Sequence, residues 1–135
     1  MNHWLKVEHN SDLLFSEHAY TMAVSEKCDV YSFGVVTLEV VMGRHPGDLI
    51  SSFASLSYDV LLKDILDQRL AHPTNQVEAK VILVLKIALA CLHTNPQSRP
   101  TMRQVSQKLS NWKSPFTKPL HMITLRELID LDNFN

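Results

Sequence analysis

The chain has 135 residues, of which 45% are hydrophobic, and its 13 basic and 14 acidic residues leave a formal net charge of −1. A chain of this length and composition suits one globular domain and is too apolar to be disordered. The balanced charge gives no electrostatic support for a nucleic-acid partner or for an anionic membrane surface.

Residues 1–16 are polar and follow neither a helical nor a strand period, so we interpret them as a poorly ordered lead-in. They lack the apolar core of a signal peptide. No apolar run in the chain reaches the roughly 17–25 residues that a membrane-spanning helix needs. The sequence therefore predicts neither a signal peptide nor a transmembrane segment.

The next predicted element is a helix from Asp29 to Met42, whose apolar residues cover every side of a helical wheel. Ser25 is a candidate cap ahead of this helix, Gly43 ends it, and Pro46 prevents its continuation. We expect the helix to be buried all round and to form the central post of the domain. Asp29 is then expected in its first turn, at the edge of a segment with no Lys or Arg partner.

The middle of the chain predicts further helices. A short helix is expected around Leu49, Ile50 and Phe53, and the stretch "VLLKDILDQRL" follows it with apolar residues on one face. Residues 77–93 form the clearest amphipathic segment, because apolar side chains recur at helical spacing. Those side chains are Val81, Val84, Leu85, Ala88 and Leu92.

Two capping-box patterns predict the starts of the last two helices. Thr101 with Gln104 follows the breaker "TNPQSRP", and Thr124 with Glu127 precedes the amphipathic stretch "LRELIDL". No stretch shows the sustained alternation of a β-strand. The predicted fold class is therefore all-α, a helical bundle around one central buried helix.

The segment "SEKCDVYSFGVVTLEVVMGRHP", followed later by "CLHTNPQSRPTMRQV", resembles the end of a eukaryotic protein kinase domain. More narrowly, it is similar to plant leucine-rich-repeat receptor-like serine/threonine kinases. The resemblance covers residues 17–112 and implies a partial kinase large lobe, from the end of the activation segment to the last helix. Residues 113–135 then form a C-terminal tail with a short amphipathic helix, which either packs on its own domain or docks on a partner.

The resemblance gives Asp29 a role. In the family, the matching aspartate accepts hydrogen bonds from the backbone of the catalytic loop, which ties the active site to the central helix. A carboxylate that accepts backbone N–H bonds is held in its ionised form. From the residues alone, Asp29 would merely complement the helix dipole, an effect worth roughly 0.3–1 kcal/mol.

The resemblance also implies an ion pair between Arg99 and the glutamate that closes the activation segment, a position that Glu17 takes here. Phe15 and Ser16 replace the alanine and proline that precede this glutamate in the family. The alternative is an exposed arginine without a carboxylate partner. Glu39, inside the central helix, is a candidate buried carboxylate, and the resemblance implies a structural role for it.

A working kinase of this family needs a Gly-rich loop, a strand lysine, an HRD catalytic loop and a DFG aspartate for magnesium. None of these motifs occurs in the sequence, and its three glycines form no phosphate-binding pattern. The resemblance implies ATP and magnesium for the parent family. In this chain we expect no catalytic residue and no cofactor.

Cys28 and Cys91 lie in apolar segments and are interpreted as buried, reduced thiols. Cys91 and His93 offer two metal ligands where a structural zinc site needs four, so we expect no metal. We also expect Tyr31 and Val35 to present apolar surface that the missing part of the kinase domain would cover.

Two functions remain open at this point. The first is that of the C-terminal part of a receptor-like serine/threonine kinase, on the cytosolic side of the plasma membrane. The second is that of a cytoplasmic, non-catalytic module or decoy that binds other kinases or signalling proteins, or of an unstable truncated product.

Overall fold

The structure is a computed structural model that describes residues 18–53, 60–111, 113, 116 and 118–130, with side chains described from residue 26 onward. Its elements are helices and 3₁₀ turns. In chain order they are α3 (His18–Met42), α4 (Gly47–Ser52), α5 (Leu62–Ile65), α6 (Asn75–Cys91), η2 (Pro96–Ser98), α7 (Met102–Asn111), η3 (Leu120–Met122) and α8 (Leu125–Asp130). Across these ranges there is no β-strand, so the predicted all-α class is confirmed.

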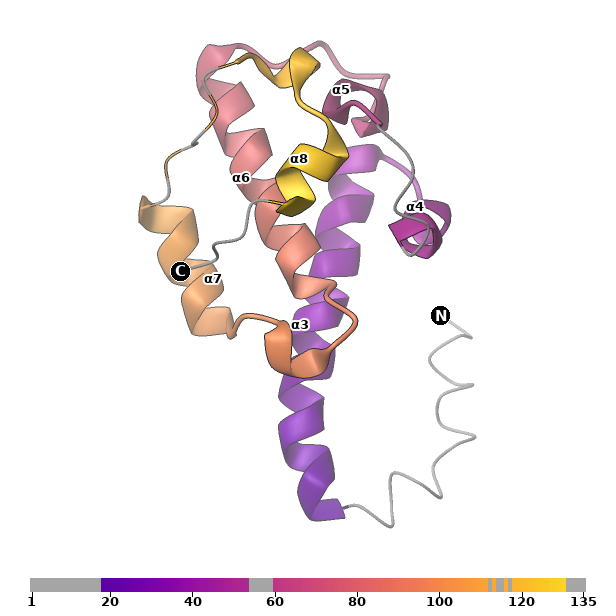
Figure 1. The fold of residues 1–135 in the computed structure, drawn as a ribbon, viewed down its shortest axis with the longest axis vertical. Coiled ribbons are helices and arrows are strands. Elements are labelled where there is room, and N and C mark those ends of the chain that lie inside the picture. Colours follow the sequence, from indigo (N-terminus) through magenta and orange to yellow (C-terminus); the bar gives the residue numbers. More distant parts are fainter. Residues whose placement is uncertain (1–17, 54–59, 112, 114–115, 117, 131–135) are drawn as a thin grey trace.

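Helix α3 is 25 residues long and extends beyond the other helices at its N-terminal end (Figure 1). It begins at His18, so the expected start beside Ser25 is wrong and Asp29 lies well inside the helix rather than in its first turn. The segment before Asp29 contains no Gly or Pro that would interrupt a helix. The predicted end is confirmed, because Gly43 has a φ of 72° and its N–H donates to the Glu39 carbonyl oxygen at 2.8 Å.

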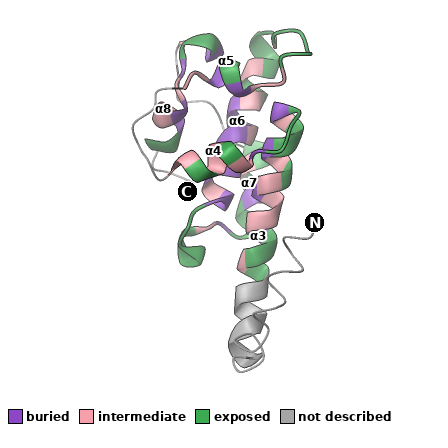
Figure 2. Ribbon diagram, turned by 90° about the vertical axis from the view of Figure 1, so that its right-hand side faces the viewer, coloured by how far each residue is buried: buried purple, intermediate pink, exposed green. Residues whose placement is uncertain are grey.

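Helix α6, and not α3, is the most completely covered helix of the described chain. It contacts α3, α7, η3 and α8. Eight of its residues are buried: Ile82, Leu83, Leu85, Lys86, Ile87, Ala88, Leu89 and Cys91. On α3, by contrast, Val36 is 56% exposed and Val40 is 73% exposed. Figure 2 shows part of the difference, since α3 is mostly pink and green where its side chains are described, whereas purple appears along α6. The expectation that α3 is buried all round is therefore wrong.

Gly34 explains how α3 and α6 pack so closely. A Cβ atom at this buried position would lie 3.0 Å from the Ala88 carbonyl oxygen and 3.0 Å from side-chain atoms of Cys91 and Leu92. Real Cβ contacts are rarely so short, so any larger residue would push the helices apart. The two helices thus meet where α3 has no side chain.

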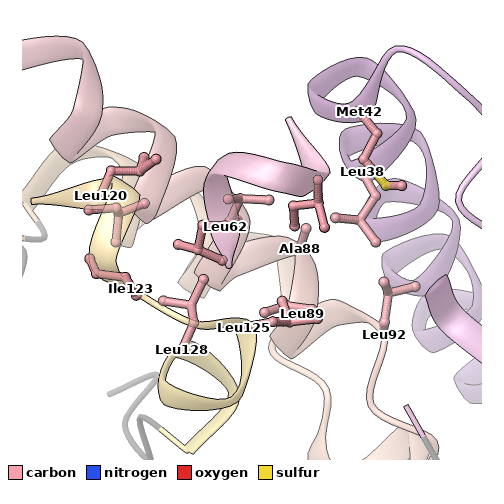
Figure 3. Close-up of a cluster of buried hydrophobic side chains, with 13 residues drawn as sticks. Leu38, Met42, Leu62, Ala88, Leu89, Leu92, Leu120, Ile123, Leu125 and Leu128 are labelled. Atoms are coloured by element: carbon pink, nitrogen blue, oxygen red, sulfur yellow. The ribbon is translucent and has the colours of Figure 1, made fainter. Parts of the chain in front are cut away.

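The hydrophobic core draws on both ends of the chain. Leu38 and Met42 of α3 face α5 and α6, and the far side of the cluster is built by the C-terminal segment (Figure 3). That segment contributes Leu120, Ile123, Leu125 and Leu128, each at most 2% exposed. Fully burying such a side chain is worth roughly 1.5–3 kcal/mol. The expectation that the tail helix packs on its own domain is confirmed.

Two backbone hydrogen bonds fix the tail against the middle of the chain. The N–H of Leu62 donates to the Ile123 carbonyl oxygen at 2.9 Å, and the N–H of Leu125 donates to the Val60 carbonyl oxygen at 2.7 Å. They form an isolated antiparallel bridge between Leu61 and Thr124. The bridge therefore holds the residue before α8 beside the residue before α5.

Both predicted capping boxes are confirmed. The Thr101 hydroxyl accepts from the Gln104 N–H at 3.1 Å, and the Gln104 side chain accepts from the Thr101 N–H at 2.8 Å. At α8, the Thr124 hydroxyl accepts from the Glu127 N–H at 3.1 Å, and Glu127 accepts from the Thr124 N–H at 3.0 Å. Each box satisfies backbone donors that the first helical turn leaves unpaired.

Within the described residues, none of the helices combines the length and the apolar character that crossing a lipid bilayer requires.

Candidate functional site

Asp29 and Glu39, two of the residues singled out from the sequence, lie on α3, and Arg99 contacts it. Asp29 is exposed on this helix, and among the residues that the structure describes no group donates a hydrogen bond to its carboxylate. Glu39 is also exposed, so the expectation of a buried carboxylate is wrong. The physical reason is the same for both residues, because the described elements that pack on α3 leave the positions of Asp29 and Glu39 exposed.

Arg99, which follows η2, reaches back to α3 through the backbone. Its Nη1 donates to the Lys27 carbonyl oxygen at 2.9 Å, and its Nε donates to the His93 carbonyl oxygen at 2.8 Å. In return, Nζ of Lys27 donates to the Arg99 carbonyl oxygen at 2.9 Å. Two cations thus join α3 to the segment between α6 and α7 through backbone carbonyl groups.

The proposed partner of Arg99, Glu17, lies outside the described residues, so their ion pair stays a prediction. Among the residues that are described, Arg99 forms no ion pair. Its guanidinium instead lies 4.8 Å from the centre of the Tyr31 ring, within the range of a cation–π contact. Arg99 is therefore half-buried and held by aromatic and carbonyl groups, which differs from the freely exposed arginine of the alternative interpretation.

The sequence interpretation did not connect Lys27 or Tyr31 with Arg99. They lie four residues apart on α3 and share the side of the helix that carries Leu38. The signal that could have found them is this spacing, since residues at i, i+4 and i+11 lie on one helical face. Tyr31 and Val35 pack against the core cluster and are partly buried, so the described elements cover them in part.

The two cysteines have different environments. Cys91 is fully buried, as expected, and burial raises the pKa of its thiol to about 11, although the charge of Arg99 acts in the opposite direction. This thiol stays protonated at neutral pH and is a poor nucleophile. Cys28 is exposed, so its predicted burial is wrong, because α3 turns this residue away from α6.

A small hollow lies between α3 and the start of α7. It has a volume of about 180 Å³ and is lined by Glu26, Lys27, Asp29, Val30, Thr101 and Met102. Pockets for drug-sized ligands and cofactors usually have volumes of about 300–1,000 Å³. The described residues also contain no group of three or more His, Cys, Asp or Glu side chains with metal-ligand geometry. The described residues around Asp29 and Arg99 thus join α3 to the segment between α6 and α7.

The sequence model of the family described as protein tyrosine and serine/threonine kinase matches residues 8–109. The chain belongs to the protein kinase family. The match begins inside residues 1–16, so part of the stretch interpreted as a lead-in also resembles the family. This segment of a kinase domain is 49% identical over 111 residues to MDIS1-interacting receptor like kinase 2 from Arabidopsis thaliana, covering 81% of this chain and 11% of that protein.

Two further similar proteins from Arabidopsis thaliana are also receptor-like kinases. A leucine-rich repeat receptor-like protein kinase is 46% identical, over 81% of this chain and 10% of that protein. An LRR receptor-like serine/threonine-protein kinase is 39% identical, over 70% of this chain and 9% of that protein. The kinase segment therefore spans about a tenth of the length of these curated relatives. No solved structure matches it.

Proposed function

We propose that this chain forms a helical, non-catalytic part of the large lobe of a receptor-like serine/threonine kinase domain. The family match over residues 8–109 and the names of the receptor-like relatives support this assignment. The all-helical fold and the buried contact between α3 and α6 agree with it. In a full-length receptor of this kind, the segment would lie on the cytosolic side of the plasma membrane.

The observation that carries the proposal is the combination of motifs. The chain has the "DVYSFG" and "RPTM" signatures and lacks the Gly-rich loop, the HRD catalytic loop and the DFG aspartate. Phosphoryl transfer depends almost wholly on positioning and charge stabilisation by these groups. We therefore expect that the 135-residue chain neither binds ATP nor transfers phosphate. ATP and magnesium would be bound by other parts of the domain in the parent family.

The test is a phosphotransfer assay with radiolabelled ATP and magnesium on the purified chain, with a generic protein substrate present. We expect no incorporation above that of a mock purification from the same host. Thermal unfolding with and without Mg-ATP provides a second readout and should give the same Tm. Incorporation that follows the chain through successive columns, together with a rise in Tm, would contradict the proposal.

A second candidate function is that of a non-catalytic interaction module. The observation that favours it is the apolar surface on α3, where Val36 and Val40 are 56% and 73% exposed. Mass spectrometry of the endogenous polypeptide separates the two candidates. A protein of 15.4 kDa would favour the module. A much longer polypeptide that contains the same peptides would favour the kinase lobe.

A further inference from the structure

The feature that carries a further inference is the contact between α6 and the C-terminal segment. Residues 118–130, which we call the strap, contain η3 and α8, and both of these elements contact α6. In Figure 1 the strap begins near the N-terminal end of α6 and descends beside it. The strap and α6 therefore run in the same direction. Two charged residues of α6, Glu78 near its start and Lys86 in its second half, contact the strap.

Glu78 holds the beginning of the strap. Its Oε1 accepts a hydrogen bond from the backbone N–H of Leu120 at 3.4 Å. Leu120 is the first residue of the 3₁₀ turn η3, and the first N–H groups of a helical turn have no partner within it. Glu78 thus supplies an acceptor for a backbone donor that η3 itself does not satisfy, beside the buried Leu120 side chain.

Lys86 holds the other end of the strap. Among the residues that the structure describes, it is the one buried charged residue, with 8% of its surface exposed. Its Nζ donates to the carbonyl oxygen of Leu128 at 3.3 Å. Leu128 lies in the last turn of α8, where carbonyl groups have no partner within the helix and where a cation interacts favourably with the helix dipole. Because lysine is almost never buried unless its charge is paired or hydrogen-bonded, this contact indicates a specific use of the side chain.

The two contacts agree in register and in polarity. Each joins residues that are 42 positions apart in the sequence. At the first contact α6 provides the acceptor, and at the second contact it provides the donor. A strap in the reverse direction would bring the last carbonyl groups of α8 toward the Glu78 carboxylate, and neither of these groups has a hydrogen to donate. The pair of contacts therefore distinguishes one direction from the other.

We propose that Glu78 and Lys86 form a clasp on α6 that sets the direction and register in which the strap docks. The buried leucine and isoleucine side chains of the strap supply most of its binding, but apolar burial is not directional and tolerates alternative positions. Hydrogen bonds to the two charged groups are directional, and a buried polar group left unpaired in a shifted position costs free energy. Glu78 and Lys86 are thus positioning residues, and the strap is a lid over α6 that loosens when either contact is removed.

Amide hydrogen exchange followed by NMR tests the clasp in the full chain. In K86M, which keeps a long side chain and removes the donor, exchange of the Leu128 amide should accelerate roughly tenfold or more, because the end of the strap opens locally. Amides of α3 should keep their wild-type rates. The matched control is K80M, since Lys80 is exposed on the same helix. K86R should retain the protection because it keeps a donor.

The beginning of the strap has its own variants. E78M removes the acceptor and should accelerate exchange of the Leu120 amide, whereas E78Q keeps an acceptor oxygen and should not. The register is measured at the bridge between Leu61 and Thr124, a non-hydrogen-bonded antiparallel pair whose Cα hydrogens give a nuclear Overhauser signal when the strap is docked. Both K86M and E78M should weaken this signal.

Unchanged exchange and an unchanged bridge signal in K86M and E78M would overturn the proposal. Acceleration of the α3 amides by the same factor would also overturn it, because the two residues would then support the whole fold and not the position of the strap. An effect of K80M equal to that of K86M would have the same meaning. If K86M does not fold, the variants of Glu78 decide, and equal exchange of the Leu120 amide in E78M and E78Q would contradict the clasp.

Discussion

Helices α3 and α6 are the two long helices of the described chain, and their neighbours cover them to very different degrees. α6 lies between α3 and the C-terminal elements and buries most of its second half, including the charged residue Lys86. α3 is equally apolar in its middle but buries only the side that faces α6. The difference shows that an apolar sequence makes a helix suitable for burial, whereas the surrounding elements decide which sides are covered.

The strongest test of this comparison is to truncate one apolar side chain in each helix. Leu85 of α6 is 0% exposed, so L85A should lower the free energy of unfolding by about 2–5 kcal/mol. Val40 of α3 is 73% exposed, so V40A should change it by no more than about 0.5 kcal/mol. Equilibrium urea unfolding at a concentration where the chain is monomeric measures both values. Equal losses would mean that α3 is as well covered as α6.

A second variant examines the contact between the two helices. G34V adds a branched side chain where a Cβ atom would already lie 3.0 Å from the Ala88 carbonyl oxygen. We expect a loss of about 1–3 kcal/mol, the usual effect of overpacking a close contact. The control is C28V, which introduces the same side chain at an exposed position of α3. If G34V unfolds at the same urea concentration as the control, the close approach at Gly34 does not stabilise the fold.

Removing the two capping boxes tests how much α7 and α8, which both contact α6, contribute to stability. T124A removes the cap of α8, and T101A removes the cap of α7; losing such a cap costs roughly 0.5–2 kcal/mol. T124A should be the more destabilising, because α8 covers α6 with the buried side chains of Leu125 and Leu128. Thermal unfolding followed by circular dichroism ranks the two variants. A larger effect of T101A would contradict the importance assigned to the tail.

The smallest expected effect is a pH dependence at the C-terminal end of α3. There the Asp67 N–H donates to the Val41 carbonyl oxygen, and Arg69 forms an ion pair with the Asp67 carboxylate at 2.8 Å. Hydrogen bonds from Arg69 lower the pKa of Asp67 from 3.8 to about 2. A lowered folded-state pKa contributes stability that is fully present above pH 3.8 and is lost as the pH falls through about 2.

Two variants measure this contribution. D67N should remove the part of the acid-induced loss that belongs to this carboxyl group, and R69Q should reduce it, because without the Arg69 side chain the folded-state pKa of Asp67 moves back toward 3.8. The effect should be small and should diminish with salt, because the Arg69 side chain is 77% exposed. Unfolding measured at several pH values between neutrality and acid gives the comparison. Parallel curves for the wild type and both variants would show that the ion pair does not contribute.

Local features of the fold could be predicted from the sequence. Both capping boxes form as expected, and α3 ends at Gly43, because these signals depend on residues within a few positions of each other. The helical period of residues 77–93 also corresponds to α6. The start of α3 was not predictable in the same way, since Ser25 can either cap a helix or lie within one.

The candidate site was less accessible to sequence reasoning. Asp29 and Arg99 could be singled out from the motifs, but the partners of Arg99 are carbonyl oxygens of Lys27 and His93 and the ring of Tyr31. Carbonyl groups are present at every residue, so no sequence pattern identifies the ones that accept these bonds. The exposure of Glu39 was equally hidden, because it depends on which elements lie beside α3.

The sequence by itself determined the all-α class, the helix caps, the end of α3 and membership of the protein kinase family, because each depends on residue types at fixed short spacings or on motifs read directly. Only the tertiary structure decided that α6 is the most completely covered helix of the described chain, that the C-terminal tail completes the core, and that the described elements leave Val36 and Val40 of α3 exposed. The physical reason is that a side chain is buried only when another element packs against it. The residues of that second element are far away in the sequence, so a local pattern does not identify them.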